Sequence, residues 1–225
     1  MKVLAVEFVT SAAAGGTSTG IPRDGLPQVA MAGRSNVGKS TLINALLRRQ
    51  VARTSAAPGK TRLANVFRVT VEGGPGGPGR WPLYLVDLPG YGYAKGGGAD
   101  AGKELAAVAE AYFAASVEGR ATGSSRTSKG PGPITLLLVD SRHPGLEADT
   151  QAHQWLTTLG VEPLIVATKV DKLSRGERTR NLRELERIFG KPALPVSADR
   201  GEGLDELWKT IASRARTART RAADE

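Results

Sequence analysis

The segment Gly33-Arg-Ser-Asn-Val-Gly-Lys-Ser40 decides how this chain is expected to fold. It matches the phosphate-binding pattern G-x-x-x-x-G-K-[ST] at every fixed position. Residues 29–32 read as a short buried strand before it, and residues 41–49 read as a helix after it. Glycines let such a loop wrap a phosphate chain with its N–H groups pointing inward, and the positive end of the following helix adds to the attraction.

A bound nucleotide is therefore predicted at this loop. The alternative, a glycine-rich turn with no ligand, does not account for a strand and a helix on the required sides. Lys39 is expected to reach the terminal phosphates, and the Ser40 hydroxyl is expected to bind a magnesium ion. The pattern alone does not say which nucleotide is bound.

Composition limits the class of protein. The 225 residues suit one domain, and 40% apolar residues is ordinary for a globular protein. The absence of cysteine excludes disulfides, thiolate metal sites and cysteine nucleophiles. The longest apolar runs have the length of strands and the N-terminus lacks a secretory pattern, so we expect no membrane span and no secretory signal.

The chain is strongly basic, with a net charge of +9 and a pI of 10.1. Such an excess indicates a polyanionic partner, with nucleic acid as the first candidate. The alternative is a solvated basic surface without a specific partner.

Strands and helices alternate along the chain. This alternation predicts an α/β fold with three layers, in which helices cover both faces of a mostly parallel six-stranded sheet. The expected strands are 29–32, 65–72, 83–86, 134–140, 163–167 and 193–196, and the expected helices are 41–49, 103–117, 147–159, 174–189 and 203–217.

We expect a single domain over residues 1–225, with its core at 28–213 and a basic tail at 214–225. The low-complexity segment 119–133 is expected to be a flexible insertion. The glycine-rich run 73–79 is expected to be a flexible connection, and residues 50–64 a mobile loop.

Asp87-Leu-Pro-Gly90 ends one buried strand. A carboxylate there can hold magnesium through water, and the Gly90 N–H can sense the terminal phosphate. Asp and Gly are common in turns, so this pattern gains weight only from its place one strand after the phosphate loop.

Thr168-Lys-Val-Asp171 ends a later strand and indicates the base. Guanine offers two adjacent donors that one carboxylate, Asp171, can accept, whereas adenine would leave this carboxylate unpaired. The Lys169 stem can lie along the flat face of the base. Ser197-Ala198 follows the last strand, where a backbone N–H could donate to the guanine carbonyl. The alternative for Asp171 is a surface salt bridge.

These elements, in this order, resemble a GTPase of the Ras-like superfamily. The segments GRSNVGKSTLINALL, RTSAAPGKT, DLPGYGYAK, VDSRHPG, TKVDKL and PVSA together resemble the EngB family of bacterial GTP-binding proteins, also called YihA or YsxC. The resemblance runs from about Phe8 to Leu207. It implies a P-loop GTPase fold and a magnesium-dependent, cytoplasmic GTPase with GTP as substrate and GDP as product.

The resemblance also implies partners: the precursor of the large ribosomal subunit and its ribosomal RNA. It implies an association with cell division and septation. A monomer is expected.

Carried over by position, Thr61 would meet magnesium when GTP is bound, within a nucleotide-contacting loop at 59–63. From the residues alone, Thr54 and Ser55 are rival hydroxyls. Lys39, Thr61 and Gly90 are the candidate catalytic residues, and Ser40 and Thr61 the candidate metal ligands, with Asp87 acting through water. The candidate nucleotide contacts are Gly33, Arg34, Ser35, Asn36, Val37, Gly38, Lys39, Ser40, Thr41, Gly59, Lys60, Thr61, Arg62, Leu63, Asp87, Leu88, Pro89, Gly90, Thr168, Lys169, Val170, Asp171, Val196, Ser197 and Ala198.

Tyr91 stands where related GTPases have a water-positioning glutamine. A phenol cannot offer the same amide geometry, so slow intrinsic hydrolysis is expected unless a partner or another cation assists. Asn36 resembles the asparagine of potassium-stimulated GTPases, which makes K⁺ a candidate. The alternative is that Asn36 only stabilises the turn.

Two alternative functions stay open: a GTP-occupied recruitment scaffold with negligible turnover, and an ATP-using P-loop enzyme, which the Asp171 argument opposes. GTP is expected to order residues 50–64 and 90–100 into a docking surface. No aromatic stacking platform accompanies the arginines, so base-specific reading of RNA or DNA is not expected. The candidate phosphate contacts to ribosomal RNA are Arg48, Arg49, Arg53, Arg214, Arg216, Arg219 and Arg221, each of which could instead be a solvated charge.

Overall fold

The computed structural model describes residues 1–12, 21–22, 24–52, 63–74, 77–91, 109–113 and 132–223. Of the helix expected at 103–117, the part within these residues, 109–113, is helical. Most of the expected insertion at 119–133 lies outside them.

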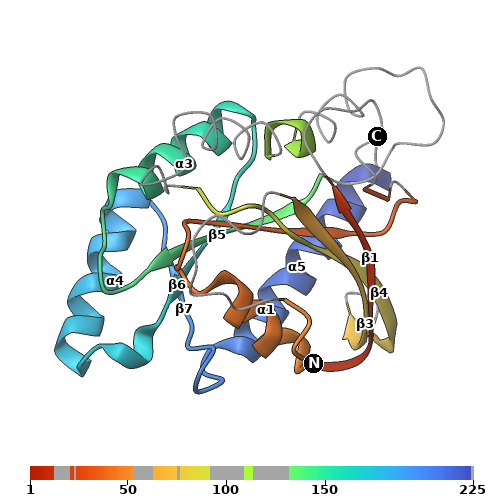
Figure 1. Cartoon of the computed structure of the whole chain (residues 1–225), viewed down its shortest axis with the longest axis horizontal. Helices are drawn as coiled ribbons and strands as arrows, with labels where there is room; N and C mark the ends of the chain where they lie inside the picture. The colour runs from red at the N-terminus through yellow and green to blue at the C-terminus, as the bar shows by residue number, and fades with distance from the viewer. Residues whose placement is uncertain are drawn as a thin grey trace.

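A seven-stranded mixed sheet forms the centre of the molecule (Figure 1), in the order β1-β3-β4-β2-β5-β6-β7. The five neighbouring strands β4, β2, β5, β6 and β7 are parallel to one another, whereas β3 pairs antiparallel with both β1 and β4. The strands are β1 (Lys2–Ala12), β2 (Gln28–Gly33), β3 (Ala64–Gly74), β4 (Gly77–Asp87), β5 (Ile134–Asp140), β6 (Leu164–Thr168) and β7 (Leu194–Pro195).

The prediction of six strands was wrong by one, because β1 has no clear strand pattern in the sequence. β1 is an edge strand whose pairing with β3 carries register shifts. Phe8 remains 61% exposed even though its ring lies 5.9 Å from that of Phe67. Such a half-buried edge gives only a weak alternating pattern in the sequence.

Helices cover both faces of the sheet, which confirms the three-layer α/β prediction. The helices are α1 (Lys39–Leu47), α3 (Glu147–Thr158), α4 (Arg175–Phe189) and α5 (Leu204–Ala223), with a 3₁₀ turn η1 (Val170–Lys172). Figure 1 shows α1 and α5 on one side of the sheet, and α3 with the helical residues 109–113 on the other.

β5 shows how the strands divide the core. All seven of its residues are buried, as expected for a central parallel strand. Leu136 and Leu138 belong to the cluster that includes α1 and α5, whereas Leu137 and Val139 belong to the cluster that includes α3 and α4. Because alternate residues of a strand point to opposite faces, one apolar run supplies both cores.

Two further boundaries differ from prediction. Gly74 pairs with Gly77 across the β3–β4 hairpin, so strand pairing extends into the run 73–79 that was expected to be flexible. The last helix continues to Ala223, so the arginines predicted to follow it lie within it. Alanine and arginine are both strong helix formers, which explains the extension.

None of the described helices is long and apolar enough to cross a membrane. The carboxyl ends of the parallel strands β2, β4, β5 and β6 lie at one edge of the sheet. In open α/β sheets this edge is where ligands bind.

Asn44 fixes the segment that follows α1. Its side chain is 5% exposed and accepts hydrogen bonds from the N–H groups of Val51 (2.9 Å) and Ala52 (2.8 Å). Its amide also donates to the Ala52 carbonyl at 2.8 Å and to Gln50 at 3.0 Å. One side chain therefore satisfies three backbone groups.

We predict that Asn44→Ala lowers the free energy of unfolding by about 2–4 kcal/mol, because buried backbone groups lose their partners. The control is Gln50→Ala, which removes only an exposed contact and should cost less than about 1 kcal/mol. Urea denaturation of both variants measures this difference, and equal losses would contradict the assignment.

Candidate functional site

The phosphate-binding loop occupies residues 34–38, between β2 and α1. Gly38 has a φ of 100°, which strains any other residue, and Asn36 also has a left-handed φ of 65°. The Ser35 N–H donates to the Tyr91 carbonyl at 3.0 Å. A Cβ on Gly90 would lie 3.0 Å from Ser35 Oγ, so the segment after β4 packs closely on the loop.

Lys39 and Asp87 form an ion pair beside the loop. Both residues are almost buried, at 9% and 3% exposed. Two of the candidate residues, 48 positions apart, thus come together. Hydroxyl and carboxylate oxygens are ligands that Mg²⁺ accepts, so Ser40 at the start of α1 and Asp87 at the end of β4 fit the predicted magnesium role.

The segment after β6 reaches back to the same loop. The buried Thr168 hydroxyl donates to the Val37 carbonyl at 2.7 Å. Lys169 has a left-handed φ of 60°, and its ammonium donates to the Asn36 carbonyl at 2.6 Å. The predicted phosphate segment and the predicted base segment are therefore connected directly.

Asp140, at the end of β5, holds this connection and was missed by sequence reasoning. Its carboxylate accepts from Lys169 Nζ at 2.9 Å and from Arg142 Nε and Nη2 at 2.9 and 2.7 Å. Burial acts to raise the pKa of Asp140, but the hydrogen bonds from Arg142 and Lys169 lower it to about 2. The sequence feature that could have identified Asp140 is a carboxylate at the end of a buried strand.

Asp171 lies in η1 with only 4% of its side chain exposed. Ser197 Oγ donates to its Oδ1 at 2.7 Å, and Lys172 Nζ lies 3.1 Å from its Oδ2. Burial opposes ionisation, yet these contacts hold the pKa of Asp171 below its ordinary value. The carboxylate is therefore ionised at neutral pH and able to accept hydrogen bonds.

The N–H of Ser197 donates to the Glu202 carbonyl at 3.0 Å. Of the pair Ser197-Ala198, this leaves Ala198 to supply the backbone donor that the sequence predicts for the base.

A cavity of about 270 Å³ joins the loop to these segments. Its lining includes Asp171 and Lys169, the residues that the sequence assigns to the base. Leu42, Arg142, Lys172 and Asp199 line it without having been predicted. Its remaining lining residues, all candidates from the sequence, are Gly38, Thr41, Thr168, Lys169, Asp171, Val196 and Ala198.

Tyr91 points to α3. Its hydroxyl donates to Asp149 Oδ1 at 3.0 Å, and Arg34 Nε lies 3.5 Å from Asp149 Oδ2. Burial raises the pKa of the Tyr91 phenol and of the Asp149 carboxyl, and the nearby Arg34 guanidinium opposes both shifts. The contact joins the segment after Gly90 to the phosphate loop and to α3, a link with no signal in the sequence.

Several candidates lie outside the described residues, namely Arg53, Thr54, Ser55, Gly59, Lys60, Thr61, Arg62 and most of 90–100. Leu63 is described and 37% exposed. The other candidate nucleotide contacts that the structure describes lie in residues 33–41 around the phosphate loop, at and after the end of β4, at and after the end of β6, and after β7. Arg48 and Arg49 follow α1, and the arginines from Arg214 onward lie in α5.

Comparison with known proteins gives a consistent result. A family model described as 50S ribosome-binding GTPase matches residues 28–169. A probable GTP-binding protein EngB of Pelotomaculum thermopropionicum is 38% identical over 216 residues, which is 94% of this chain and 96% of that protein. The probable GTP-binding protein EngB of Solibacter usitatus is 40% identical over 214 residues, with 94% and 96% covered.

Among solved structures, a probable GTP-binding protein engB has the same fold, with a TM-score of 0.57 and 22% identity. The match covers 84% of this chain and 98% of that one.

We predict that Tyr91→Phe lowers the free energy of unfolding by about 1–3 kcal/mol, because the buried Asp149 carboxylate loses a donor. Tyr84→Phe is the matched control: its hydroxyl donates at 2.8 Å to the exposed Asp24, which water can solvate instead. Thermal or urea unfolding compares the free energies of unfolding of the two variants. A larger loss for the Tyr84 variant would contradict a stabilising role for the hydrogen bond between Tyr91 and Asp149 of α3.

Proposed function

Because the chain belongs to the EngB family of GTP-binding proteins, we propose that it hydrolyses GTP slowly, as a switch in assembly of the large ribosomal subunit. The observation that carries the nucleotide site is the direct contact between the phosphate loop and the segment 168–171 around one cavity. The site would act in the cytoplasm, where ribosomes assemble. The family association with cell division and septation would follow from that role.

Each end of the nucleotide has its own contacts in this proposal. The phosphates lie over the N–H groups of residues 33–41, with Lys39 at the terminal phosphates. The base enters the cavity, where Asp171 accepts the two adjacent guanine donors and the Lys169 stem covers one face. Ala198 donates its N–H to the guanine carbonyl.

Magnesium is proposed to bind Ser40 directly and Asp87 through water, with Thr61 added when GTP is bound. The ion supplies neutralisation of charge on the terminal phosphates. Lys39, already beside Asp87, supplies a second positive charge at the same place. The Gly90 N–H, next to Ser35, is placed to sense the terminal phosphate.

Slow hydrolysis follows from Tyr91. Its hydroxyl is hydrogen-bonded to Asp149, so it does not replace a glutamine that orients water. Acceleration then requires a group from a partner or a further cation. K⁺ near Asn36 is one candidate, although the carbonyl of this residue already accepts from Lys169.

We propose that GTP orders residues 50–64 and 90–100 into a surface that docks on the large-subunit precursor. A recruitment scaffold that hardly turns over is the second candidate, favoured by the engaged position of Tyr91.

The identity of the base is tested by Asp171→Asn. We predict that the variant loses guanine affinity by roughly a thousandfold or more and gains a preference for xanthine nucleotides. Xanthine has a carbonyl where guanine has an amino group, and the asparagine amide can donate to it. Competition of GDP and xanthosine diphosphate against a fluorescent nucleotide measures this.

The control for this change is Asp199→Asn. Asp199 lines the same cavity but is 56% exposed, so its variant should keep the guanine preference. If the Asp171 variant also keeps it, Asp171 does not read the base.

The switch is tested by single-turnover hydrolysis with and without large ribosomal subunits. We predict slow turnover alone, at least tenfold faster turnover with particles, and tighter particle binding with a non-hydrolysable GTP analogue than with GDP. Turnover that stays negligible in both cases would support the scaffold instead. Equal particle binding with both nucleotides would contradict a switch.

The cation is tested in the same assay by exchanging sodium for potassium. A faster rate in potassium is expected if the Asn36 resemblance holds, and an unchanged rate would remove K⁺ from the mechanism.

A further inference from the structure

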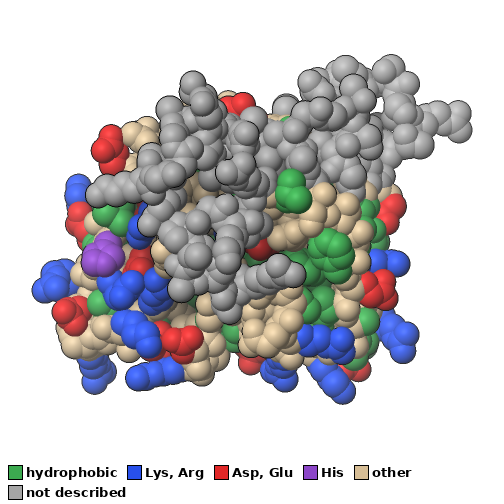
Figure 2. All heavy atoms as spheres, viewed as in Figure 1, with side chains coloured by type: hydrophobic (Ala, Val, Ile, Leu, Met, Phe, Trp, Pro, Cys, Tyr) green, Lys and Arg blue, Asp and Glu red, His purple; other side chains and the backbone are tan. Residues whose placement is uncertain are grey.

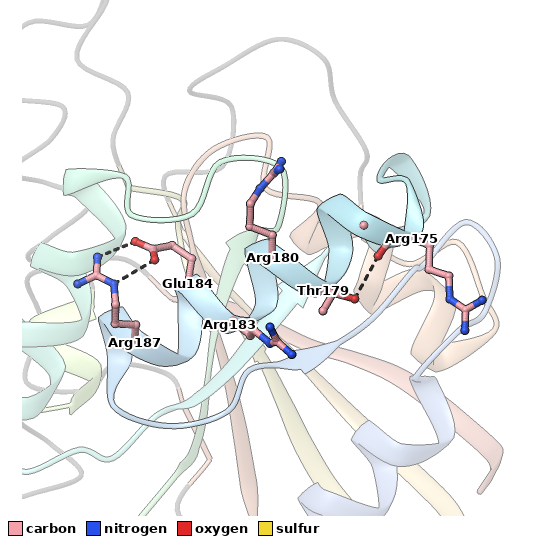
Figure 3. A pocket seen from close by; sticks show the side chains of 7 residues that line it. Arg175, Thr179, Arg180, Arg183, Glu184 and Arg187 are labelled. Atoms are coloured by element: carbon pink, nitrogen blue, oxygen red, sulfur yellow. Dashed lines mark hydrogen bonds and ion pairs between the residues drawn. The ribbon is translucent and has the colours of Figure 1, made fainter.

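The exposed side of α4 carries several arginines, which project from both sides of the helix in Figure 3. Figure 3 shows Arg175, Arg180, Arg183 and Arg187 along the helix, and we refer to these four as the α4 arginine stripe. They line an open groove of about 750 Å³ together with Gly176, Thr179 and Glu184. The opposite face of the helix is buried through Asn181, Leu185 and Phe189.

Nearby carboxylates compensate only part of this charge. Arg187 forms a two-point ion pair with Glu184, at 2.6 and 3.0 Å. Within the described part of the chain, Arg175, Arg180 and Arg183 form no ion pair, and all three are exposed. The Glu177 carboxylate also interacts electrostatically with Arg180, so four arginines face two glutamates and the surface keeps a positive excess. Figure 2 shows lysine and arginine side chains at lower left with carboxylates between them, and further basic side chains along the bottom and the right edge.

The lining of the groove indicates the kind of ligand. It contains arginine, glycine, threonine and glutamate but no apolar anchor, whereas specific protein interfaces centre on buried apolar or aromatic residues. Guanidinium groups match phosphate geometry with two parallel hydrogen bonds. At a rise of 1.5 Å per residue the stripe spans about 18 Å, enough for several consecutive phosphates.

We propose that the α4 arginine stripe binds the phosphate backbone of ribosomal RNA. This proposal rests on the proposed function and adds to it an RNA-binding surface. It differs from the arginines picked out by sequence: Arg214, for example, donates to the Glu162 carbonyl at 3.0 Å and is only partly exposed.

The stripe stands on a firmly held helix. Ser174 and Glu177 form a capping box at its start. Arg178 pairs with Glu202 at 2.5 Å, and Asn181 donates to the Ser141 carbonyl at 2.8 Å. These contacts lead to Ser141 and Glu202, and neither residue belongs to the segments proposed to respond to GTP. We therefore expect the stripe to contribute with GDP as it does with GTP.

The test replaces both central arginines, Arg180→Gln with Arg183→Gln, and measures binding of the full chain to purified large ribosomal subunits. At about 0.15 M salt the variant should bind at least tenfold more weakly, with the same loss for GDP and for a non-hydrolysable GTP analogue. The slope of log K against log salt concentration should become less steep by about 1.5–2, because two phosphate contacts are lost.

Two controls accompany it. Lys2→Gln with Lys209→Gln removes equal charge from exposed positions elsewhere and should bind within twofold of the wild type. Arg180→Lys with Arg183→Lys keeps the charge and should keep the salt slope. GDP affinity and circular dichroism establish that each variant is folded, as expected for exposed helix positions.

Unchanged affinity in the glutamine variant would overturn the proposal, and so would a loss confined to one nucleotide. A loss with an unchanged salt slope would also overturn it, because the partner would then be a protein surface and not phosphate. Binding of the wild type and the glutamine variant to an RNA duplex of about 20 base pairs tests RNA binding by the stripe independently of the proposed role in ribosome assembly. If the wild type does not bind ribosomal particles, the proposed function is wrong. Weaker duplex binding by the glutamine variant than by the wild type would then still support RNA binding by the stripe, and equal binding would contradict it.

Discussion

The Lys169 ammonium makes the contact on which the rest of the site depends. It joins the Asn36 carbonyl, in the phosphate loop, to the Asp140 carboxylate at the end of β5. Thr168 adds a second connection to Val37. Because Thr168 and Lys169 both hold the loop and line the cavity, the sheet fixes the position of the loop relative to the cavity in which we propose that the base binds. The guanine-nucleotide site that we propose is built from residues at strand ends.

The contacts of the site form two groups, one around the cavity and one around the phosphate loop. Asp171, Ser197 and α4 are connected by hydrogen bonds and ion pairs around the base cavity. The phosphate loop meets the segment after β4 through Ser35, Tyr91 and Gly90. In our account the first part recognises the base and carries a constant RNA contact, whereas the second responds to the terminal phosphate. A switch needs both, because a partner must be held while one surface changes.

The phosphate loop, the parallel strands and most helix ends were predictable, because each has a local pattern of glycine, buried apolar runs or caps. β1 was not, because an edge strand with Phe8 exposed lacks clear alternation. Asp140 could have been suspected from its strand-end position. The contact of Tyr91 with Asp149 could not, because it joins residues 58 apart whose meeting depends on how α3 packs. Sequence patterns thus locate a site but do not show which of its groups are already engaged.

We propose that the site selects guanine through Asp171. The most direct measurement is competition of GDP and ADP against a fluorescent guanine nucleotide on the unmodified chain, at equal magnesium. The account predicts that GDP binds at least about a thousandfold more tightly, because adenine leaves the nearly buried carboxylate without donors. Comparable affinities for the two would contradict it.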